Sequence, residues 1–235
     1  MIRALFLLLI PLLLSANELY QVSTYSALVN GVYDGTVLYR DLFKKGDFGL
    51  GTFNGIDGEM IALDGKYYQG DPSGLLTPVR PSQKTPFAAV IFFKPEFPVQ
   101  LNSAKDFKHL GNILSQFIHK KNTPHAIKIE GSFRYVKIRN LEKTNPPYKP
   151  LKALLPEQHD VELYDTEGTL VGFWFPRYLK GINVGGYHFH YIDEKKQSGG
   201  HVLDVSLKRG MAYYQLADSL TIDYPNTKPF DEADL

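Results

Sequence analysis

Cysteine is absent from this sequence of 235 residues. Its absence excludes disulfide bonds, thiolate nucleophiles and thiolate-bound metals, so any metal must be held by imidazole and carboxylate groups. An excess of charge of either sign is also lacking, because 26 basic and 25 acidic residues leave a formal net charge of +1. That balance gives no reason to expect nucleic acid as a partner. With 43% hydrophobic residues, the chain can fill one large core or two small lobes with a shared core.

A hydrophobic run long enough to span a membrane is lacking as well, although the N-terminus comes near to it. Arg3 gives a positive start, residues 4–14 are apolar apart from Pro11, and Ser15-Ala16 ends the run with small residues. The run stays below the roughly 20 apolar residues of a membrane span. We therefore predict a signal peptide over residues 1–16 and an exported mature chain, periplasmic or extracellular, without stable membrane association after cleavage. An uncleaved N-terminal anchor is the alternative.

Strand-like segments dominate the mature chain, and turn residues separate them. The predicted strands are 48–53, 59–68, 88–93, 126–138, 161–164, 169–175, 186–192, 202–207, 211–216 and 220–224. Helical spacing of apolar residues predicts helices over 24–33 and 102–119. The proline-rich run 145–150 fits neither a helix nor a central strand. It predicts a boundary between an N-terminal α+β lobe of residues 17–150 and a C-terminal lobe of residues 151–235, in an α+β fold with mostly antiparallel sheet.

Three of the seven histidines fall within fourteen residues, as His188, His190 and His201. Side chains alternate along a strand, so His188 and His190 should share one face while Phe189 points to the other. A hairpin centred on Lys195-Lys196 would pair residue 190 with residue 201, with their Cβ atoms roughly 5 Å apart on one face. The three imidazoles should then converge. Three protein ligands with a vacant position are the pattern of a catalytic zinc site.

The same histidines also allow other interpretations. A bare His-x-His is weak evidence, because a pair of surface or core histidines is commoner, and the third histidine is what favours a metal. His188 and His190 followed by Glu194 also resemble the first motif of the cupins, which are metal-binding β-barrels. The second cupin motif requires Pro-x-Gly and a further histidine, and neither follows His201. The cupin alternative is therefore disfavoured.

Three further features have ordinary interpretations when they are taken alone. The glycine-rich segment 46–51 could cradle a phosphate, but no Gly-Lys-Ser/Thr follows, so the tight start of a strand fits better. Asp57-Gly58-Glu59 could be a β-turn with an exposed acid. Arg139 could be an ordinary charge at the end of a strand.

The glycine-rich segment, Glu59 and the histidines also belong to a series of motifs that follow one another in a fixed order. The chain carries Gly-Asp-Phe-Gly-Leu-Gly-Thr-Phe-Asn at 46–54 and Gly-Tyr-His-Phe-His at 186–190. Further matching segments are 20–24, 31–35, 56–59, 83–88, 147–148, 170–173, 181–185 and 198–204. From about Leu19 to Leu235 the sequence resembles the α-acetolactate decarboxylases.

The resemblance implies a mixed β-sheet N-terminal lobe packed with a smaller, mainly antiparallel C-terminal lobe that carries a three-histidine zinc site. Carried over residue by residue, it assigns the zinc ligands to His188, His190 and His201. It assigns active-site roles to Glu59 and to Arg139, although the residues that follow Arg139 depart from the family pattern. Thr52 lies inside the strongest motif and is expected to line the substrate pocket.

The implied activity is zinc-dependent decarboxylation of 2-acetolactate to acetoin and CO2. In such a reaction the metal stabilises an enediolate, Arg139 holds the carboxylate, and Glu59 moves the proton to one face of the intermediate. No organic cofactor is needed. The oligomeric state is left open, with a homodimer as one option.

Two other functions remain open from the sequence. Zinc held by three histidines also activates water for hydrolysis. A weakly active or non-catalytic zinc-binding homologue is the second, because relatives place a second active-site glutamate near their C-terminus and alignment offers no counterpart here. Either Glu232 or the terminal carboxylate reaches the pocket, or the site works with one carboxylate. We expect the second outcome, since Asp231, Glu232 and Asp234 read as a solvated acidic tail.

Overall fold

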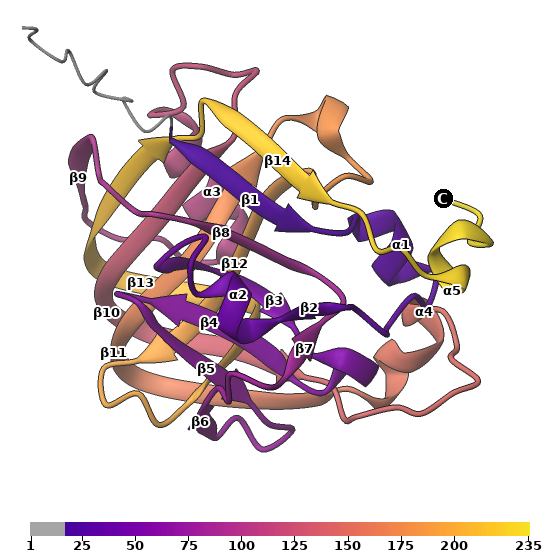
Figure 1. Ribbon diagram of the computed structural model, residues 1–235. Coiled ribbons are helices and arrows are strands. Elements are labelled where there is room, and N and C mark those ends of the chain that lie inside the picture. The colour runs from indigo at the N-terminus through magenta and orange to yellow at the C-terminus, as the bar shows by residue number, and fades with distance from the viewer. Residues whose placement is uncertain (1–16) are drawn as a thin grey trace, which may run out of the picture.

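The computed structural model describes residues 17–235, so the predicted signal peptide lies outside the described residues. The fold contains two large β-sheets (Figure 1). The first has seven strands in the order β14-β1-β8-β3-β4-β5-β6. It is a mixed sheet, because β1 pairs in parallel with β14 and antiparallel with β8. Its strands are β1 (Glu18–Val22), β3 (Phe48–Thr52), β4 (Glu59–Leu63), β5 (Lys66–Gly70), β6 (Leu76–Pro78), β8 (Ala88–Ile91) and β14 (Ser219–Asp223).

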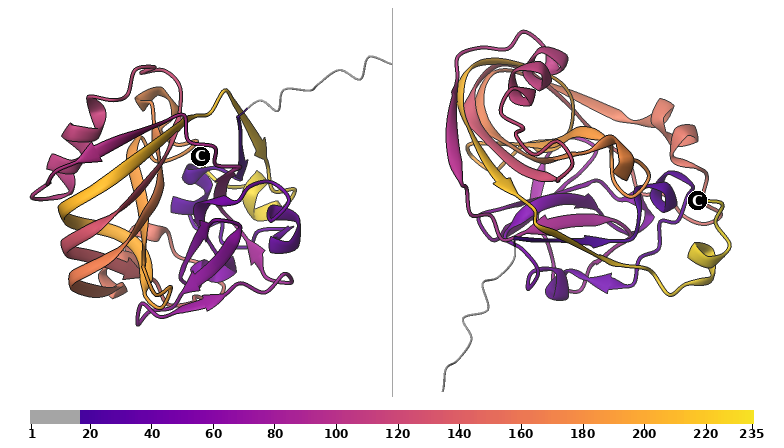
Figure 2. Two further views of the ribbon diagram at one scale, coloured as in Figure 1. Left: turned by 90° about the vertical axis from the view of Figure 1, so that its left-hand side faces the viewer. Right: turned by 90° about the horizontal axis from the view of Figure 1, so that it is seen from above.

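The second sheet has five strands in the order β10-β11-β12-β13-β9, and all its pairings are antiparallel. It closes on itself, because β10 also pairs with β13, and so forms a small barrel. Figure 2 shows the barrel and the first sheet as two layers. The strands are β9 (Phe97–Leu101), β10 (His125–Asn140), β11 (His159–Phe175), β12 (Gly186–Asp193) and β13 (Gly199–Leu216). A separate short pair joins β2 (Val37–Leu38) and β7 (Lys84–Thr85).

The helices are short and surround these sheets. They are α1 (Tyr25–Val29), α2 (Tyr39–Leu42), α3 (Phe107–Ser115), α4 (Leu151–Leu154) and α5 (Lys228–Asp231), with 3₁₀ turns η1 (Asn54–Ile56), η2 (Leu155–Glu157) and η3 (Arg177–Leu179). None of the helices in the described part of the chain is long and apolar enough to cross a membrane.

The predicted helix over 102–119 exists, but α3 begins later than expected. The Asp106 carboxylate caps it by accepting a hydrogen bond of 2.7 Å from the His109 N–H. The preceding residues are extended, because Ala104 exchanges backbone hydrogen bonds with Leu207 of β13. The helix predicted over 24–33 is likewise shorter, since α1 ends at Val29.

Several predicted strands have different limits because glycine acts differently in the two sheets. The predicted strand 59–68 is a hairpin, in which Asp64 and Gly65 adopt φ angles of 51° and 75°. Segments 161–164 and 169–175 form one strand, β11, as segments 202–207 and 211–216 form β13. Gly168 lies inside β11 rather than in a turn, since a Cβ there would come within 2.4 Å of the Ile192 carbonyl oxygen.

The α+β class with mostly antiparallel pairing is confirmed, and the first sheet is mixed as expected. The two sheets do not divide the chain at residue 150. Strands β9 and β10 precede that residue but belong to the barrel, and β14 returns to the first sheet. The division of the chain into two lobes at residue 150 therefore stays a prediction.

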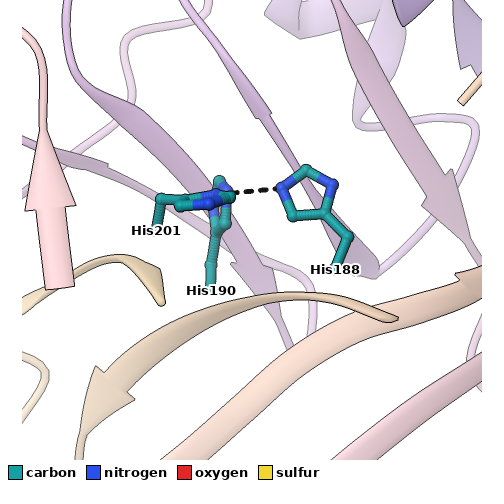
Figure 3. A group of neighbouring side chains, drawn as sticks. All are labelled: His188, His190 and His201. Atoms are coloured by element: carbon teal, nitrogen blue, oxygen red, sulfur yellow. Dashed lines mark hydrogen bonds between the residues drawn. The ribbon is translucent and has the colours of Figure 1, made fainter. Parts of the chain in front are cut away.

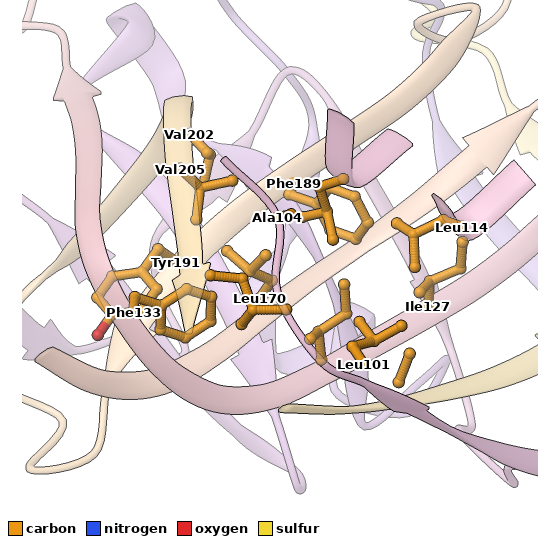
Figure 4. Packing of buried hydrophobic residues seen from close by; sticks show 14 of the residues in the cluster. Leu101, Ala104, Leu114, Ile127, Phe133, Leu170, Phe189, Tyr191, Val202 and Val205 are labelled. Atoms are coloured by element: carbon orange, nitrogen blue, oxygen red, sulfur yellow. The ribbon is translucent and has the colours of Figure 1, made fainter. Parts of the chain in front are cut away.

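The barrel interior is filled with apolar side chains, several of which are labelled in Figure 4. Phe189 and Tyr191 of β12 belong to this core and are at most 1% exposed. Because side chains alternate along a strand, His188 and His190 lie on the outer face of the barrel. That face packs against β4 of the first sheet. The sequence prediction for Phe189 is thereby confirmed.

Candidate metal centre and active site

The three histidines meet on the outer face of the barrel, from strands β12 and β13. His190 pairs directly with His201, as the hairpin symmetry predicted. His188 Nε2 lies 3.0 Å from His201 Nδ1, and the rings point toward one another (Figure 3). One nitrogen from each of the three residues lies within 4.8 Å of the others. The group could therefore hold a metal ion.

The protonation of these rings suits metal ligands. Burial lowers the pKa of His188 to about 3 and lowers the pKa values of His190 and His201 well below their usual range. The rings are therefore neutral, with lone pairs free to bind a metal. His190 Nδ1 lies 2.9 Å from the Met60 carbonyl oxygen, to which it can donate. That bond orients the ring and leaves His190 Nε2 buried with no hydrogen-bond partner among residues 17–235.

Glu59 is the first residue of β4 and is 9% exposed. Its Oε2 atom lies 3.4 Å from His190 Nε2. Burial raises the pKa of Glu59 to about 8, and the opposing effect of the Arg139 charge is smaller. Because His190 and Glu59 are both neutral in this state, their contact is not an ion pair. The interpretation of Glu59 as an exposed acid in a turn is wrong.

Thr52 fixes the turn that presents Glu59. The two residues are paired across strands β3 and β4. The Thr52 hydroxyl donates a hydrogen bond of 2.6 Å to the Gly58 carbonyl oxygen, directly before Glu59. The glycine-rich segment before Thr52 is close-packed strand, since a Cβ at Gly49 would lie 2.1 Å from the Ala89 carbonyl oxygen. The strand interpretation of this segment is confirmed.

Arg139 lies near the end of β10, directly opposite His201 in the barrel. Its Nη1 donates a hydrogen bond of 3.1 Å to Gln158 Oε1. Its Nε is buried without a hydrogen-bond partner in the described chain. Across residues 17–235, the ion pairs within 4.0 Å do not include Arg139. The guanidinium therefore keeps hydrogen-bonding capacity and an uncompensated charge.

A cavity of about 300 Å³ joins these groups. Thr52, Glu59, Arg139 and the three histidines all line it, so the structure brings every predicted site residue together. Of the described residues, Glu59 alone contributes a carboxylate to the lining. The remaining wall is mostly apolar and aromatic and includes Tyr25, Leu28, Ile56, Phe87, Phe107, Leu141, Leu151, Val184, Tyr187, Phe189, Val202 and Leu203. A small organic molecule with an anionic end fits this combination.

The sequence patterns did not reveal most of the apolar wall or two polar contacts of the site. Tyr187 adjoins the histidine motif, so its position was a usable signal. Phe107 comes from the start of α3, and nothing local marks it as part of the cavity. The Met60 carbonyl and the Gln158 amide act through His190 and Arg139, and only the packing of distant strands reveals them.

The cupin alternative is wrong for this chain. Glu194 is exposed and lies in the turn between β12 and β13, outside the three-histidine group. The comparison with known proteins agrees. Residues 19–235 match the profile of the α-acetolactate decarboxylase family. The chain belongs to the α-acetolactate decarboxylase family.

Individual relatives show how far this similarity extends. The chain is 40% identical to an α-acetolactate decarboxylase of Methylococcus capsulatus, over 93% of this chain and 84% of the relative. It is 39% identical to that of Klebsiella aerogenes over the same shares of the two chains. The crystal structure of the Bacillus subtilis strain 168 enzyme superimposes with a TM-score of 0.89 at 36% identity, and the match covers 92% of this chain and 93% of that one. The protein is therefore an enzyme of this decarboxylase family.

The acidic residues near Leu235 lie apart from the cavity. Glu232 follows α5, its side chain is 67% exposed, and its Oε1 lies 3.6 Å from Lys228 Nζ. It does not line the cavity. This position agrees with the expectation of a solvated acidic tail rather than of a second carboxylate in the pocket.

We therefore expect Glu232→Gln to change turnover less than about twofold, because the side chain is exposed and lies outside the cavity, and its exposed ion pair adds little to stability. The measurement is the rate of CO2 release from acetolactate by the metal-loaded variant. A large rate loss with the metal retained would mean that Glu232 reaches the site during turnover.

Proposed function

We propose that this protein decarboxylates 2-acetolactate to acetoin and CO2 with a zinc ion held by His188, His190 and His201. The observation that carries the proposal is the cavity itself. It joins three neutral imidazoles, one buried carboxyl group and one guanidinium without an acidic partner, in a chain of the α-acetolactate decarboxylase family.

Zinc suits this ligand set better than other metals do. Neutral imidazoles with no thiolate and no second carboxylate match a catalytic zinc site with three protein ligands. Nitrogen ligands of tetrahedral zinc lie roughly 3.3 Å apart, and His188 Nε2 and His201 Nδ1 are 3.0 Å apart. The buried, unpartnered His190 Nε2 is the atom that a metal would satisfy. When bound, zinc supplies Lewis-acid stabilisation of the negative charge that develops on the substrate oxygens.

Arg139 binds the carboxylate of acetolactate in this proposal. Its planar guanidinium can form two parallel hydrogen bonds to a carboxylate, and such charge-assisted bonds are stronger than neutral ones. Its Nη1 is held by Gln158 from outside the cavity, so the remaining N–H groups can face the substrate. Binding the carboxylate in this way would orient the carbon–carbon bond that breaks when CO2 leaves.

Glu59 carries the proton. When CO2 leaves, the electron pair of the broken carbon–carbon bond moves toward the ketone, and the carbon that lost CO2 must gain a proton. Burial raises the pKa of Glu59 to about 8, so this carboxyl group can hold and release a proton near neutral pH. It approaches the cavity from the β4 side alone, so the proton arrives on one face and the acetoin is a single enantiomer.

An assay of the mature chain tests the proposal. Protein beginning near Asn17 should contain about one zinc per chain and should release CO2 and acetoin from acetolactate, and chelation should abolish the release. Hydrolysis of simple esters is the control for the alternative of zinc-activated water. Zinc binding without acetoin formation would instead support a non-catalytic homologue.

We also propose that the mature chain is exported after cleavage near Ala16. The support is the sequence of the N-terminus, in which a positive start, an apolar run and small residues follow one another. N-terminal sequencing of protein recovered outside the cytoplasm tests it, and recovery of the full-length chain only in the cytoplasm would contradict it.

A further inference from the structure

We propose that Gln158 is a positioning residue that holds Arg139 toward the cavity through a neutral hydrogen bond and so preserves the positive charge for an anionic substrate. The inference rests on the proposed function, because it concerns how the carboxylate of acetolactate is bound. Gln158 does not itself line the cavity, so it acts only through Arg139.

Asp160 is the acidic residue that would be expected to neutralise Arg139. Asp160 is paired directly with Arg139 across strands β10 and β11, which is the position of a cross-strand ion pair. That ion pair does not form. Asp160 Oδ2 instead lies 2.8 Å from Lys137 Nζ, and its Oδ1 accepts a hydrogen bond of 2.8 Å from Gln158 Nε2.

The Gln158 amide thus separates the arginine from the carboxylate. Its oxygen accepts from Arg139 Nη1 at 3.1 Å, while its nitrogen donates to Asp160. An amide can serve both neighbours because it carries an acceptor and donors at once. A glutamate at this position could accept from the arginine, but it would repel Asp160 and compensate the arginine charge. Gln158 therefore positions Arg139 and, because it is neutral, leaves the positive charge of Arg139 uncompensated.

The backbone before β11 gives Gln158 this location. Residue 158 follows the 3₁₀ turn η2, and its N–H donates to the Leu155 carbonyl oxygen at 3.2 Å. Leu151 and Leu154 of α4 are buried and anchor the segment against the fold. The amide is therefore presented to Arg139 by a packed turn rather than by a free loop.

Two variants of the zinc-loaded mature enzyme distinguish the effect of the Arg139 charge from the effect of its position. Gln158→Glu keeps the length and an acceptor oxygen but adds a negative charge. Gln158→Met keeps the length and removes the acceptor. Gln116→Glu adds the same charge at an exposed position outside the cavity and serves as the matched control.

The readouts are KM and kcat for acetolactate, together with the inhibition constant of acetoin. Acetoin is the substrate without its carboxylate, so its binding should not depend on the charge of Arg139. We expect Gln158→Glu to raise KM about tenfold, the scale of one lost charge-assisted hydrogen bond. In this variant kcat should stay within about threefold and the acetoin constant should stay unchanged. Gln158→Met should raise KM by a smaller factor, and Gln116→Glu should match the wild type.

A wild-type KM in Gln158→Glu would overturn the inference. Equal KM values in Gln158→Glu and Gln158→Met would also overturn it, because charge would then play no part. A parallel rise of KM and of the acetoin constant would show general damage to the site instead. Failure of the wild type to release CO2 from acetolactate would contradict the proposed function itself. This outcome is distinguishable from the three above, which concern the Gln158 variants of an active enzyme.

Discussion

His190→Ala is expected to abolish stoichiometric zinc binding and, with it, nearly all release of CO2 from acetolactate. His190 is 1% exposed, and its Nε2 has no hydrogen-bond partner in the described chain, so this buried atom is free to bind the metal and its loss would remove one of three ligands. Loss of a residue that orients a ligand already costs about 10–100-fold in metal affinity. Loss of the ligand itself should cost about 100-fold or more. Zinc content after dialysis and chelator competition measure the effect.

A histidine outside the cavity provides the control for that result. His119 is exposed, and His119→Ala should retain zinc and activity. Far-ultraviolet circular dichroism should confirm that His190→Ala stays folded. Stoichiometric zinc in a chain with alanine at His188, His190 and His201 together would place the metal elsewhere.

Glu59→Gln is expected to retain zinc and to lower kcat by about 100-fold or more, the usual contribution of a general acid or base. The substitution keeps the size and buried position of the side chain and removes the group that gives and takes the proton. Glu59 is not one of the three residues proposed to bind the metal, so the metal content should match the wild type. Steady-state kinetics with the zinc-loaded protein measure the change.

The same chemical change at Glu232 is the matched control, because that side chain is exposed and does not line the cavity. A wild-type rate in Glu59→Gln would exclude Glu59 as the proton carrier. Parallel loss of zinc and turnover would assign it a role in holding the metal instead.

Local sequence patterns were sufficient to predict the three-histidine group. Strand alternation places His188 and His190 on one face because each residue rotates its side chain by half a turn. The polar, glycine-rich segment after them allows a hairpin, and its symmetry predicted the observed pairing of His190 with His201. A pairing set by a short turn depends on few residues, so it can be predicted without the rest of the fold.

The limits of the strands were harder to predict than the histidine group, because glycine occurs both in turns and inside strands. In the turn after Leu63, Gly65 allows a positive φ and reverses the chain. In β11, Gly168 instead makes room for the carbonyl oxygen of Ile192 on the neighbouring strand. The composition around each glycine does not distinguish a turn from a close approach between backbones, because the second depends on a strand that is distant in sequence.

The amino-acid sequence alone was enough to predict the three-histidine group, the α+β class and, through its long motifs, the resemblance to the family. Only the tertiary structure decided that Glu59 is buried beside His190 and that Arg139 is held by an amide instead of by Asp160. The physical reason is separation along the chain. Glu59 lies in the first sheet, and the pKa of its carboxyl group rises because that sheet packs on the outer face of the barrel and removes water. Such burial arises from contacts between segments more than a hundred residues apart, which no local pattern encodes.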